Sequence, residues 1–318
     1  PASWAGPPAP LPSTGRPCHS RGMEPWIAAT LAAAVFQAIR FALQKRLTGA
    51  GLSAVGATWA RFLYATPVLA AGLALWLGAT GTALPALSAR FWAFTVAGGL
   101  AQIGATICVV ALFRYRAFAV GLTFKKSEVL QTAALGWLVL GDAVSPAALA
   151  ALLAGFVALA ILSAPPEGVS PRDAARATAL GLVSGAAFAA AGVGYRGAVL
   201  EVAGPVALQA AVALTLATLV QSAAMAAWFA ARDRAQARAV LAAWRPGLAV
   251  GLTSLAGSLG WFAAFAQQSA AYVFALGQVE LLFGLLLGLV LFGERPARRE
   301  LLGMALLVAS LIWLVAVV

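Results

Sequence analysis

Residues 121–142 read GLTFKKSEVLQTAALGWLVLGD, and residues 273–294 read VFALGQVELLFGLLLGLVLFGE. Each stretch is an apolar run with one internal glutamate, Glu128 or Glu280, and each ends in a glycine–acid pair. An offset of 152 residues aligns the two glutamates. The same offset also aligns four further pairs without a gap: Trp76 with Trp228, Trp92 with Trp244, Gly136 with Gly288, and Asp142 with Glu294. The chain therefore contains two similar halves.

Each half contains five apolar runs of roughly 20 residues, the length needed to cross a bilayer. The expected spans are 26–46, 54–77, 91–112, 118–140 and 145–163, then 178–199, 205–230, 246–267, 270–291 and 298–318. Because five is odd, the second half enters the membrane from the opposite side. We predict an all-α integral membrane fold, with ten transmembrane helices as two inverted five-helix repeats around a central cavity, which is typical of transporters. A β-barrel would need shorter, alternating strands.

The expected organisation has four parts. Residues 1–22 are rich in Pro, Gly and Ala without an apolar core, which indicates a disordered leader or translated upstream sequence. The first repeat spans 23–163, a proline-containing linker spans 164–177, and the second repeat spans 178–318.

Composition limits the class of protein. The chain is 62% hydrophobic and 10% charged, whereas soluble domains carry about 25% charged residues. The net charge of +11 does not indicate nucleic-acid binding, because the basic residues lie mainly in short loops between apolar runs. The expected partners are a small-molecule substrate and membrane lipids. The sequence leaves the oligomeric state open, and a monomer is compatible with it.

Loop charges predict the orientation. The odd-numbered loops and their flanks hold thirteen basic residues: Lys45, Arg46, Arg114, Arg116, Arg172, Arg176, Arg232, Arg234, Arg238, Arg245, Arg295, Arg298 and Arg299. The even-numbered loops hold only Arg90 and Arg196. Cytoplasmic loops carry the excess of Lys and Arg, so both termini are expected to be periplasmic in a bacterial inner membrane.

Ionisable residues inside spans are functional candidates, since placing them there costs several kcal/mol. Glu128 and Glu280 each lie roughly 15 Å from a membrane face at 1.5 Å per residue. We expect both in one central cavity as a proton or substrate site; the alternative is a structural role. Lys125 lies one helical turn from Glu128, so Glu280 is the expected proton carrier. Lys126 is a second site candidate, or it snorkels to the interface.

Further polar residues in the spans are candidates for lining the cavity. Gln37, Arg40 and Gln44 form a stripe on one helix face, and Gln131 continues the face of Lys125 and Glu128. The other candidates are Arg61, Tyr64, Gln102, Ser254, Ser258, Trp261 and Gln278. Snorkelling by Arg61 is an alternative, and Tyr195 is expected to anchor at the interface. If the deep cations exceed the two carboxylates, an anionic or zwitterionic substrate would balance them.

Enzymatic chemistry finds little support. The one histidine is His19 in the leader, so a membrane serine protease would lack its general base. There is no second deep Asp to pair with Asp142, no Walker A loop and no cluster of metal ligands. Cys18 and Cys108 form no disulfide framework. No cofactor or metal is expected, and the chain is not expected to be an enzyme.

The stretch FRYRAFAVGLTFKKSEVLQTAALGWLVLGDAVSP (113–146) resembles the fourth-span region of the drug/metabolite transporter superfamily, EamA type. FAQQSAAYVFALGQVELLFGLLLGLVLFGERP (265–296) resembles the same region of the second half. The resemblance covers 26–318 and rests on the LGD and FGE endings, where the family has Leu-Gly-Glu or a close variant. It implies a central cavity bounded by spans three, four, eight and nine, with the closing helix of each half outside. Many relatives place both termini in the cytoplasm, contrary to the loop charges here.

The expected function is therefore secondary active transport of a small polar metabolite or drug across the inner membrane by alternating access. Export is the expected direction, and coupling to protons is an expectation that rests on the glutamates. The alternatives are a flippase for a lipid-linked substrate and a non-transport membrane assembly protein.

Overall fold

The computed structural model describes residues 24–112, 124–162, 170–283 and 298–318. Within these ranges the regular elements are helices, and no strand occurs. The helices are α1 (Pro25–Gly49), α2 (Ala54–Thr80), α3 (Ala89–Leu112), α5 (Glu128–Leu140), α6 (Pro146–Leu162), α7 (Pro171–Leu200), α8 (Val206–Arg232), α9 (Arg234–Ala242), α10 (Trp244–Gln267), α11 (Ala270–Gly277) and α13 (Arg298–Val317). Outside the described ranges lie the predicted leader, linker residues 164–169, and Arg114, Arg116, Gly288, Glu294 and Arg295.

Helix length and surface identify a membrane protein. Six described helices, α1, α2, α3, α7, α8 and α10, are long and apolar enough to cross a bilayer, and four shorter apolar helices accompany them. Large apolar side chains also face outward, for example Ile312, which is 66% exposed, and Leu138, which is 70% exposed. A soluble protein rarely exposes so much contiguous apolar surface. The chain is therefore a multi-pass helical membrane protein.

Side-chain caps fix where helices begin. The hydroxyls of Ser53 and Ser170 accept backbone hydrogen bonds at the starts of α2 and α7, as N-cap residues do. Pro171 follows Ser170 at the first helical position, which favours the helix start there. As a result α7 begins inside the predicted linker 164–177, seven residues before the predicted span. The short helix α9, capped by Asp233, was not predicted at all.

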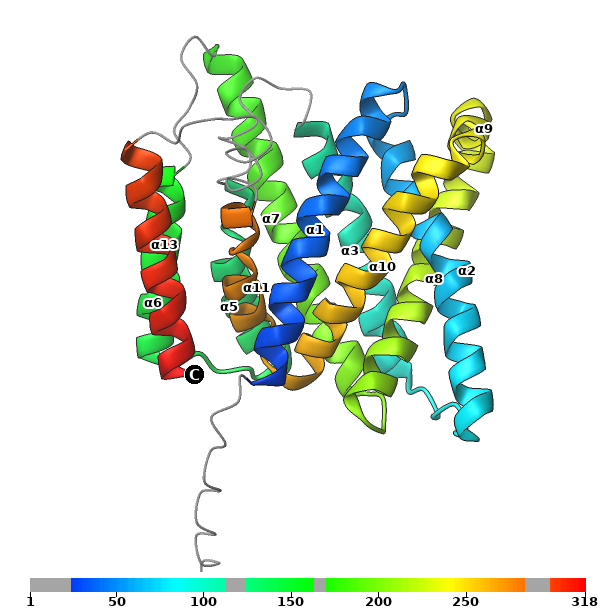
Figure 1. The fold of residues 1–318 in the computed structure, drawn as a ribbon, viewed down its shortest axis with the longest axis horizontal. Coiled ribbons are helices and arrows are strands. Elements are labelled where there is room, and N and C mark those ends of the chain that lie inside the picture. Colours follow the sequence, from blue (N-terminus) through cyan, green and yellow to red (C-terminus); the bar gives the residue numbers. More distant parts are fainter. Residues whose placement is uncertain (1–23, 113–123, 163–169, 284–297) are drawn as a thin grey trace, which may run out of the picture.

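The helices run side by side between two ends of the bundle (Figure 1). The start of α1 and the end of α13 lie at one end, which we call the termini end, and α9 lies at the opposite end, which we call the α9 end. In the described chain, residues 50–53 and α9 lie at the α9 end, whereas the connections 81–88, 141–145, 201–205 and 268–269 lie at the termini end. The helices on either side of each of these connections run in opposite directions.

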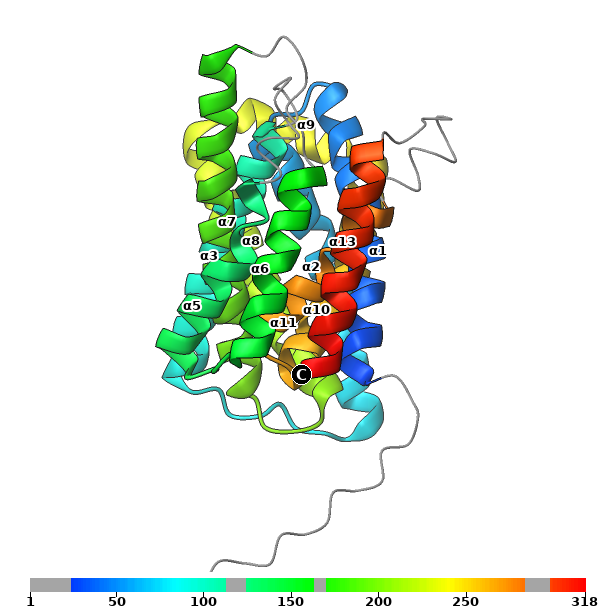
Figure 2. The same cartoon turned by 90° about the vertical axis from the view of Figure 1, so that its left-hand side faces the viewer.

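Three helix pairs make the most extensive contacts: α3 with α7, α1 with α10, and α6 with α13. Figure 2 shows α6 and α13 side by side at the edge of the bundle. Glycines bring backbones together in the first two pairs. A Cβ at Gly194 would lie 2.8 Å from Gly98 Cα, and a Cβ at Gly260 would lie 2.7 Å from the Ala29 carbonyl oxygen. Small residues at such crossings let membrane helices approach closely.

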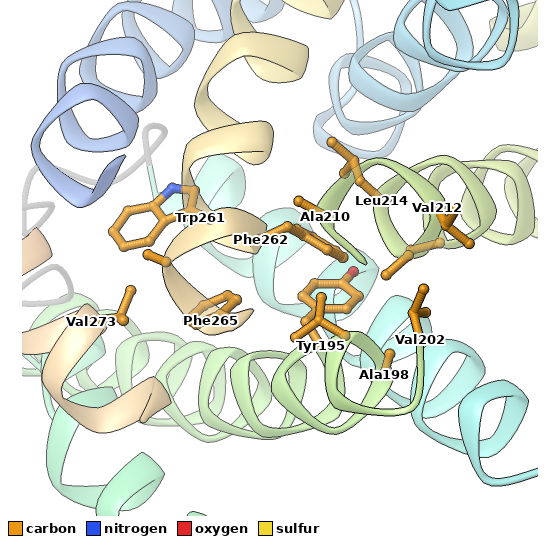
Figure 3. Packing of buried hydrophobic residues seen from close by; sticks show 14 of the residues in the cluster. Tyr195, Ala198, Val202, Ala210, Val212, Leu214, Trp261, Phe262, Phe265 and Val273 are labelled. Atoms are coloured by element: carbon orange, nitrogen blue, oxygen red, sulfur yellow. The ribbon is translucent and has the colours of Figure 1, made fainter. Parts of the chain in front are cut away.

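The largest apolar cluster among the described residues lies mainly on α7, α8, α10 and α11 and includes side chains of α1, α2 and α3. Figure 3 shows the aromatic side chains of Tyr195, Phe262, Phe265 and Trp261 among its members. The Tyr195 and Phe262 rings have centroids 4.5 Å apart, and Trp261 and Phe265 stack at 6.2 Å. This aromatic packing holds α7 against α10 beside the central cavity.

Two helix breaks position the site. A turn at residues 126–127 precedes α5, so Glu128 is the first residue of that helix, and a turn at residues 278–279 precedes the helical residues 280–283. Spans 118–140 and 270–291, predicted as continuous, are interrupted at these turns. The breaks lie at equivalent positions of the two halves, 152 residues apart. Interrupted helices of this kind build substrate and ion sites in transporters.

Candidate functional site

A buried cavity lies at the two helix breaks. Its polar lining is Gln37, Gln102, Lys125, Lys126, Glu128, Tyr195, Ser258 and Glu280, and its apolar lining includes Phe188, Trp261, Phe262, Phe265 and Phe274. The cavity volume is about 30 Å³, enough for one or a few water molecules. Small-molecule sites usually measure about 300–1,000 Å³, so a metabolite would require this site to expand.

Glu280 is held by residues of the first half. One carboxylate oxygen accepts a bond from Lys126 Nζ, and the other accepts one from Gln37 Nε2 at 2.5 Å. Lys126 is 2% exposed and Glu280 is 8% exposed. Lys126 therefore does not snorkel to the interface. No cation lies one turn from Glu280 in its own helix, but Lys126 from the other half of the chain supplies one, so the reason for expecting Glu280 rather than Glu128 to carry the proton no longer separates the two.

Glu128 has a different environment. Its Oε1 accepts a bond from Lys125 Nζ at 2.7 Å, and the Lys125 ammonium lies 4.6 Å from the centroid of the Phe188 ring. Its Oε2 is buried and has no hydrogen-bond partner among the described residues. One oxygen of Glu128 is therefore committed and the other is unsatisfied, whereas both oxygens of Glu280 are bonded.

Arg40 connects the cavity wall to α1. Its Nη1 donates to Gln44 Oε1 at 2.5 Å, and its Nη2 donates to Gln37 Oε1 at 3.4 Å. Gln44 in turn donates to the Ala57 carbonyl at 3.1 Å. The predicted polar stripe on α1 thus forms one hydrogen-bonded chain that ends at Glu280. Arg40 is 2% exposed and does not line the cavity. It contacts the cavity-lining Gln37 through the hydrogen bond to Gln37 Oε1.

Arg61 is buried on α2, and its hydrogen bonds within the described residues go to hydroxyl groups. Its guanidinium donates to Ser254 Oγ at 2.6 Å, to Thr106 Oγ1 at 3.3 Å and to Ser258 Oγ at 3.4 Å. At 4% exposure it does not snorkel to the interface. Each hydroxyl that accepts from Arg61 keeps its own O–H free to donate. Ser258 lines the cavity, so Arg61 acts on the cavity through that side chain.

The charges do not balance in the described residues. Lys125 and Lys126 each pair with a glutamate, while Arg40 and Arg61 donate to neutral partners in the hydrogen bonds above. Four buried cations thus face two buried carboxylates, and hydrogen bonds offset only part of the cost of burying a charge. The site therefore has a positive excess that an anionic group would neutralise.

A second polar network borders the cavity beside α3. Tyr195 donates its hydroxyl proton to Gln102 Oε1 at 2.9 Å, and Gln221 Nε2 donates to the same Gln102 oxygen at 2.9 Å. Tyr195 is 2% exposed, so its predicted role as an interfacial anchor is wrong. Gln221 was not predicted to contribute. The network fixes the Gln102 amide and presents the tyrosine ring to the cavity.

Besides Arg40, Gln44, Arg61 and Ser254, three more candidates lie outside the central cavity. Gln131 donates to Ser127 Oγ at 2.7 Å, within its own helical turn. Tyr64 donates to the Val240 carbonyl of α9 at 3.0 Å. Gln278 lines a separate, mainly apolar cavity of about 20 Å³ between α5, α6, α11 and α13, which also reaches Lys126.

Sequence reasoning missed most of the aromatic lining. Phe188, Phe262, Phe265 and Phe274 lie in runs that are apolar on every side, where lipid-facing and cavity-facing aromatics look alike. The one usable signal is small residues opposite them. Gly277 and Gly192 leave room for the Trp261 and Phe274 rings, which a Cβ at either glycine would overlap.

Toward the termini end, an ion pair ties three segments of the chain together. Arg196 of α7 donates to Asp142 Oδ2 at 2.9 Å and to the Phe265 carbonyl at 2.6 Å. Asp142 follows α5 and Phe265 is near the end of α10, so one guanidinium ties three segments together. We call this the Arg196 clasp, consisting of Arg196, Asp142 and Phe265.

Comparisons with known proteins bear on the fold alone. No protein-family model and no curated protein matches this sequence. One crystal structure of a protein is similar over 92% of this chain and 96% of its own, with a TM-score of 0.68 and 16% sequence identity. The agreement over nearly the whole of both chains supports the helical arrangement. At that identity it carries no information about activity.

Proposed function

We propose that this chain is a secondary transporter that moves a small anionic or zwitterionic metabolite across a bacterial inner membrane by alternating access. The proposal includes ten transmembrane helices in two inverted repeats, membership of the drug/metabolite transporter superfamily (EamA type), export as the direction, and coupling to protons. The observation that carries it is one buried cavity with a lysine–glutamate pair at each of two equivalent helix breaks. Buried ionisable groups in membrane helices are characteristic of substrate and ion paths.

Helix contacts support the inverted repeat. Under the 152-residue offset, α1 corresponds to α7 and α3 to α10, so the contact of α3 with α7 is equivalent to that of α10 with α1. These are two of the most extensive contacts in the described chain. Equivalent tryptophans also lie at opposite ends. Trp76 and Trp92 lie where α2 ends and α3 begins, at the termini end, and Trp228 and Trp244 lie near α9.

The substrate class follows from the charge balance. Arg40 and Arg61 contribute two buried positive charges whose hydrogen bonds go to neutral groups, and the two lysine–glutamate pairs are neutral overall. A carboxylate or phosphate on the substrate would offset the excess. The free Glu128 oxygen favours a substrate that also carries an amine or another hydrogen-bond donor.

A binding screen tests the proposal. Purified protein is heated with single metabolites, and a ligand that binds the folded state raises the unfolding temperature with its concentration. Anionic and zwitterionic metabolites should raise it, and the Arg61→Gln variant should lose the response. Hits then enter flux assays in proteoliposomes. Absence of any saturable, protein-dependent flux among the hits would contradict the transporter assignment.

Flux also tests the role of protons. Uptake driven by an imposed pH gradient is compared between the wild type, Glu128→Gln and Glu280→Gln. The gradient should drive uptake in the wild type but not in the variant whose substituted glutamate is the proton carrier. Exchange of labelled for unlabelled substrate should persist in that variant. If both variants respond to the pH gradient like the wild type, neither carboxylate carries the proton.

One observation favours a flippase as the second candidate. The apolar cavity between α5, α6, α11 and α13 reaches Lys126, so an apolar chain there would lie beside a charged group that suits a phosphate. A flippase would translocate a fluorescent lipid-linked phosphate in proteoliposomes, while a metabolite transporter would not. The buried charges count against an assembly protein without transport, because such a protein has no need of them.

A further inference from the structure

Two buried polar groups near the helix breaks have no partner in the described chain. They are Glu128 Oε2 and the Gln278 side-chain amide, whose nitrogen and oxygen are both unbonded. Each residue is 3% exposed. A buried polar atom without a hydrogen bond costs about 1–3 kcal/mol, and more when it is charged. An arrangement that leaves both groups unsatisfied requires a reason.

The repeat relation links these groups to a bonded pair. The 152-residue offset places Gln278 on Lys126 and Glu128 on Glu280. Lys126 donates to Glu280 in this structure. Gln278 and Glu128 are therefore the repeat equivalents of a donor and an acceptor that do bond each other.

We propose that Gln278 and Glu128 bond in the opposite conformation of the transport cycle, and that Lys126 and Glu280 part there. The proposal rests on the proposed function. In an inverted-repeat transporter the two end states arise when the repeats move against each other around a fixed site. If the repeats exchange conformations, each contact between them is replaced by its repeat equivalent. We call these two alternative bonds, Lys126–Glu280 and Gln278–Glu128, the latch. In this structure the first bond is formed and the groups of the second are unbonded.

The surroundings of Gln278 fit this role. Its cavity is lined mainly by aliphatic side chains of α5, α6, α11 and α13, and the Ser310 hydroxyl there already donates to the Leu307 carbonyl. Lys126 lines both this cavity and the central one. Helices α5 and α11 are in direct contact. Neither Lys126 nor Ser310 bonds Gln278 in this structure, and the helix that carries Glu128 is adjacent.

The two latch positions differ in strength. The Lys126–Glu280 bond joins two charges, whereas an amide donating to Glu128 is charge-assisted on one side only, and hydrogen bonds between ionised groups are the stronger. Gln37 adds a bond to Glu280, and its repeat equivalent, Ala189, cannot hydrogen-bond through its side chain. The substrate-free chain should therefore favour the present conformation.

Exchanging the two latch residues tests this inference without a known substrate. In the double variant Lys126→Gln/Gln278→Lys the lysine–glutamate pair belongs to the opposite conformation. A reporter cysteine at Ala191, which lines the cavity, is introduced after Cys18→Ser and Cys108→Ala. Labelling by a membrane-impermeant maleimide is then compared between intact cells and inverted membrane vesicles.

The expected result is that the ratio of labelling rates from the two faces changes by about tenfold or more in the double variant, in the direction of the opposite face; tenfold corresponds to about 1.4 kcal/mol. Gln278→Lys alone should shift the ratio in the same direction, and Gln278→Leu should shift it the other way. Size-exclusion chromatography in detergent checks that each variant is folded, and the single variants carry the test if the double variant is not.

An unchanged ratio in both lysine variants overturns the latch. Arg196→Ala distinguishes this failure from that of the proposed function, because loss of the Arg196 clasp should raise labelling from the termini end if the chain alternates access, whether or not the latch exists. If Arg196→Ala changes accessibility but the latch variants do not, the latch is wrong and alternating access stands. If no variant changes accessibility and the metabolite screen finds no ligand, both proposals fail.

Discussion

Removing the lysine of the buried Lys126–Glu280 pair should strongly destabilise the protein. In Lys126→Met the Glu280 carboxylate keeps Gln37 as a partner but loses its cation, at a position where Glu280 is 8% exposed. Deleting one member of a buried ion pair typically costs 3–5 kcal/mol, because the other charge stays buried and uncompensated. We expect a loss of about 3–5 kcal/mol in the free energy of unfolding.

The measurement is an equilibrium unfolding titration with sodium dodecyl sulfate in mixed micelles, followed by circular dichroism. The matched control is Arg90→Ala, which removes an ion pair with Glu201 at 3.5 Å whose arginine side chain is 74% exposed. Exposed pairs contribute about 0–1 kcal/mol, so this variant should unfold almost like the wild type.

The double variant Lys126→Met/Glu280→Gln sharpens the test. It removes both charges, so it should be less destabilised than Lys126→Met alone, although it carries one more substitution. A loss below about 1 kcal/mol in Lys126→Met, or a double variant at least as unstable as the single, would refute the reasoning that this pair is a desolvated charge pair.

Three further predictions concern orientation, gating and packing. A fluorescent protein that matures only in the cytoplasm, fused after Val318, should stay dark, since the loop charges predict periplasmic termini; bright cells would reverse the predicted orientation. Asp142→Asn should weaken the Arg196 clasp and raise labelling of the cavity cysteine from the termini end, and an unchanged rate would show that the clasp does not gate access. Gly194→Ala should cost about 1–3 kcal/mol, because its Cβ would lie 3.0 Å or less from the backbone of α3, whereas Gly104→Ala, whose Cβ would meet nothing within 4 Å, should be tolerated. Equal stability of the two glycine variants would contradict close packing of α3 on α7.

The apolar runs located the helices because a bilayer imposes a length and a composition on anything that crosses it. The predicted span 54–77 corresponds to Ala54–Thr80, and 246–267 corresponds to Trp244–Gln267. The helix boundaries near Pro171 and the break before Glu128 were missed. The first depends on a serine N-cap and the second on a turn of two residues. Both signals involve one or two residues, whereas the hydropathy pattern is averaged over about 20 residues.

The candidate site shows the same limit. Residue type alone marked Glu128, Glu280, Lys125 and Lys126 as costly inside a membrane, and the structure brings all four to one cavity. Which lysine pairs with which glutamate could not be predicted from residue spacing within a single helix. Lys126 crosses to the other half, beyond the reach of any rule based on spacing within a helix.

The contacts between helices also decide which parts of the chain can move as bodies. Backbones at Gly98 and Gly194 leave no space for a methyl group between them, so α3 and α7 slide or tilt together although they belong to different halves. The same holds for α1 and α10. Each closely packed pair therefore combines one helix from each half, and under the 152-residue offset the two pairs are repeat equivalents. If the chain alternates access as proposed, the repeats exchange conformations while these two mixed pairs stay intact, with the α6–α13 pair at the edge.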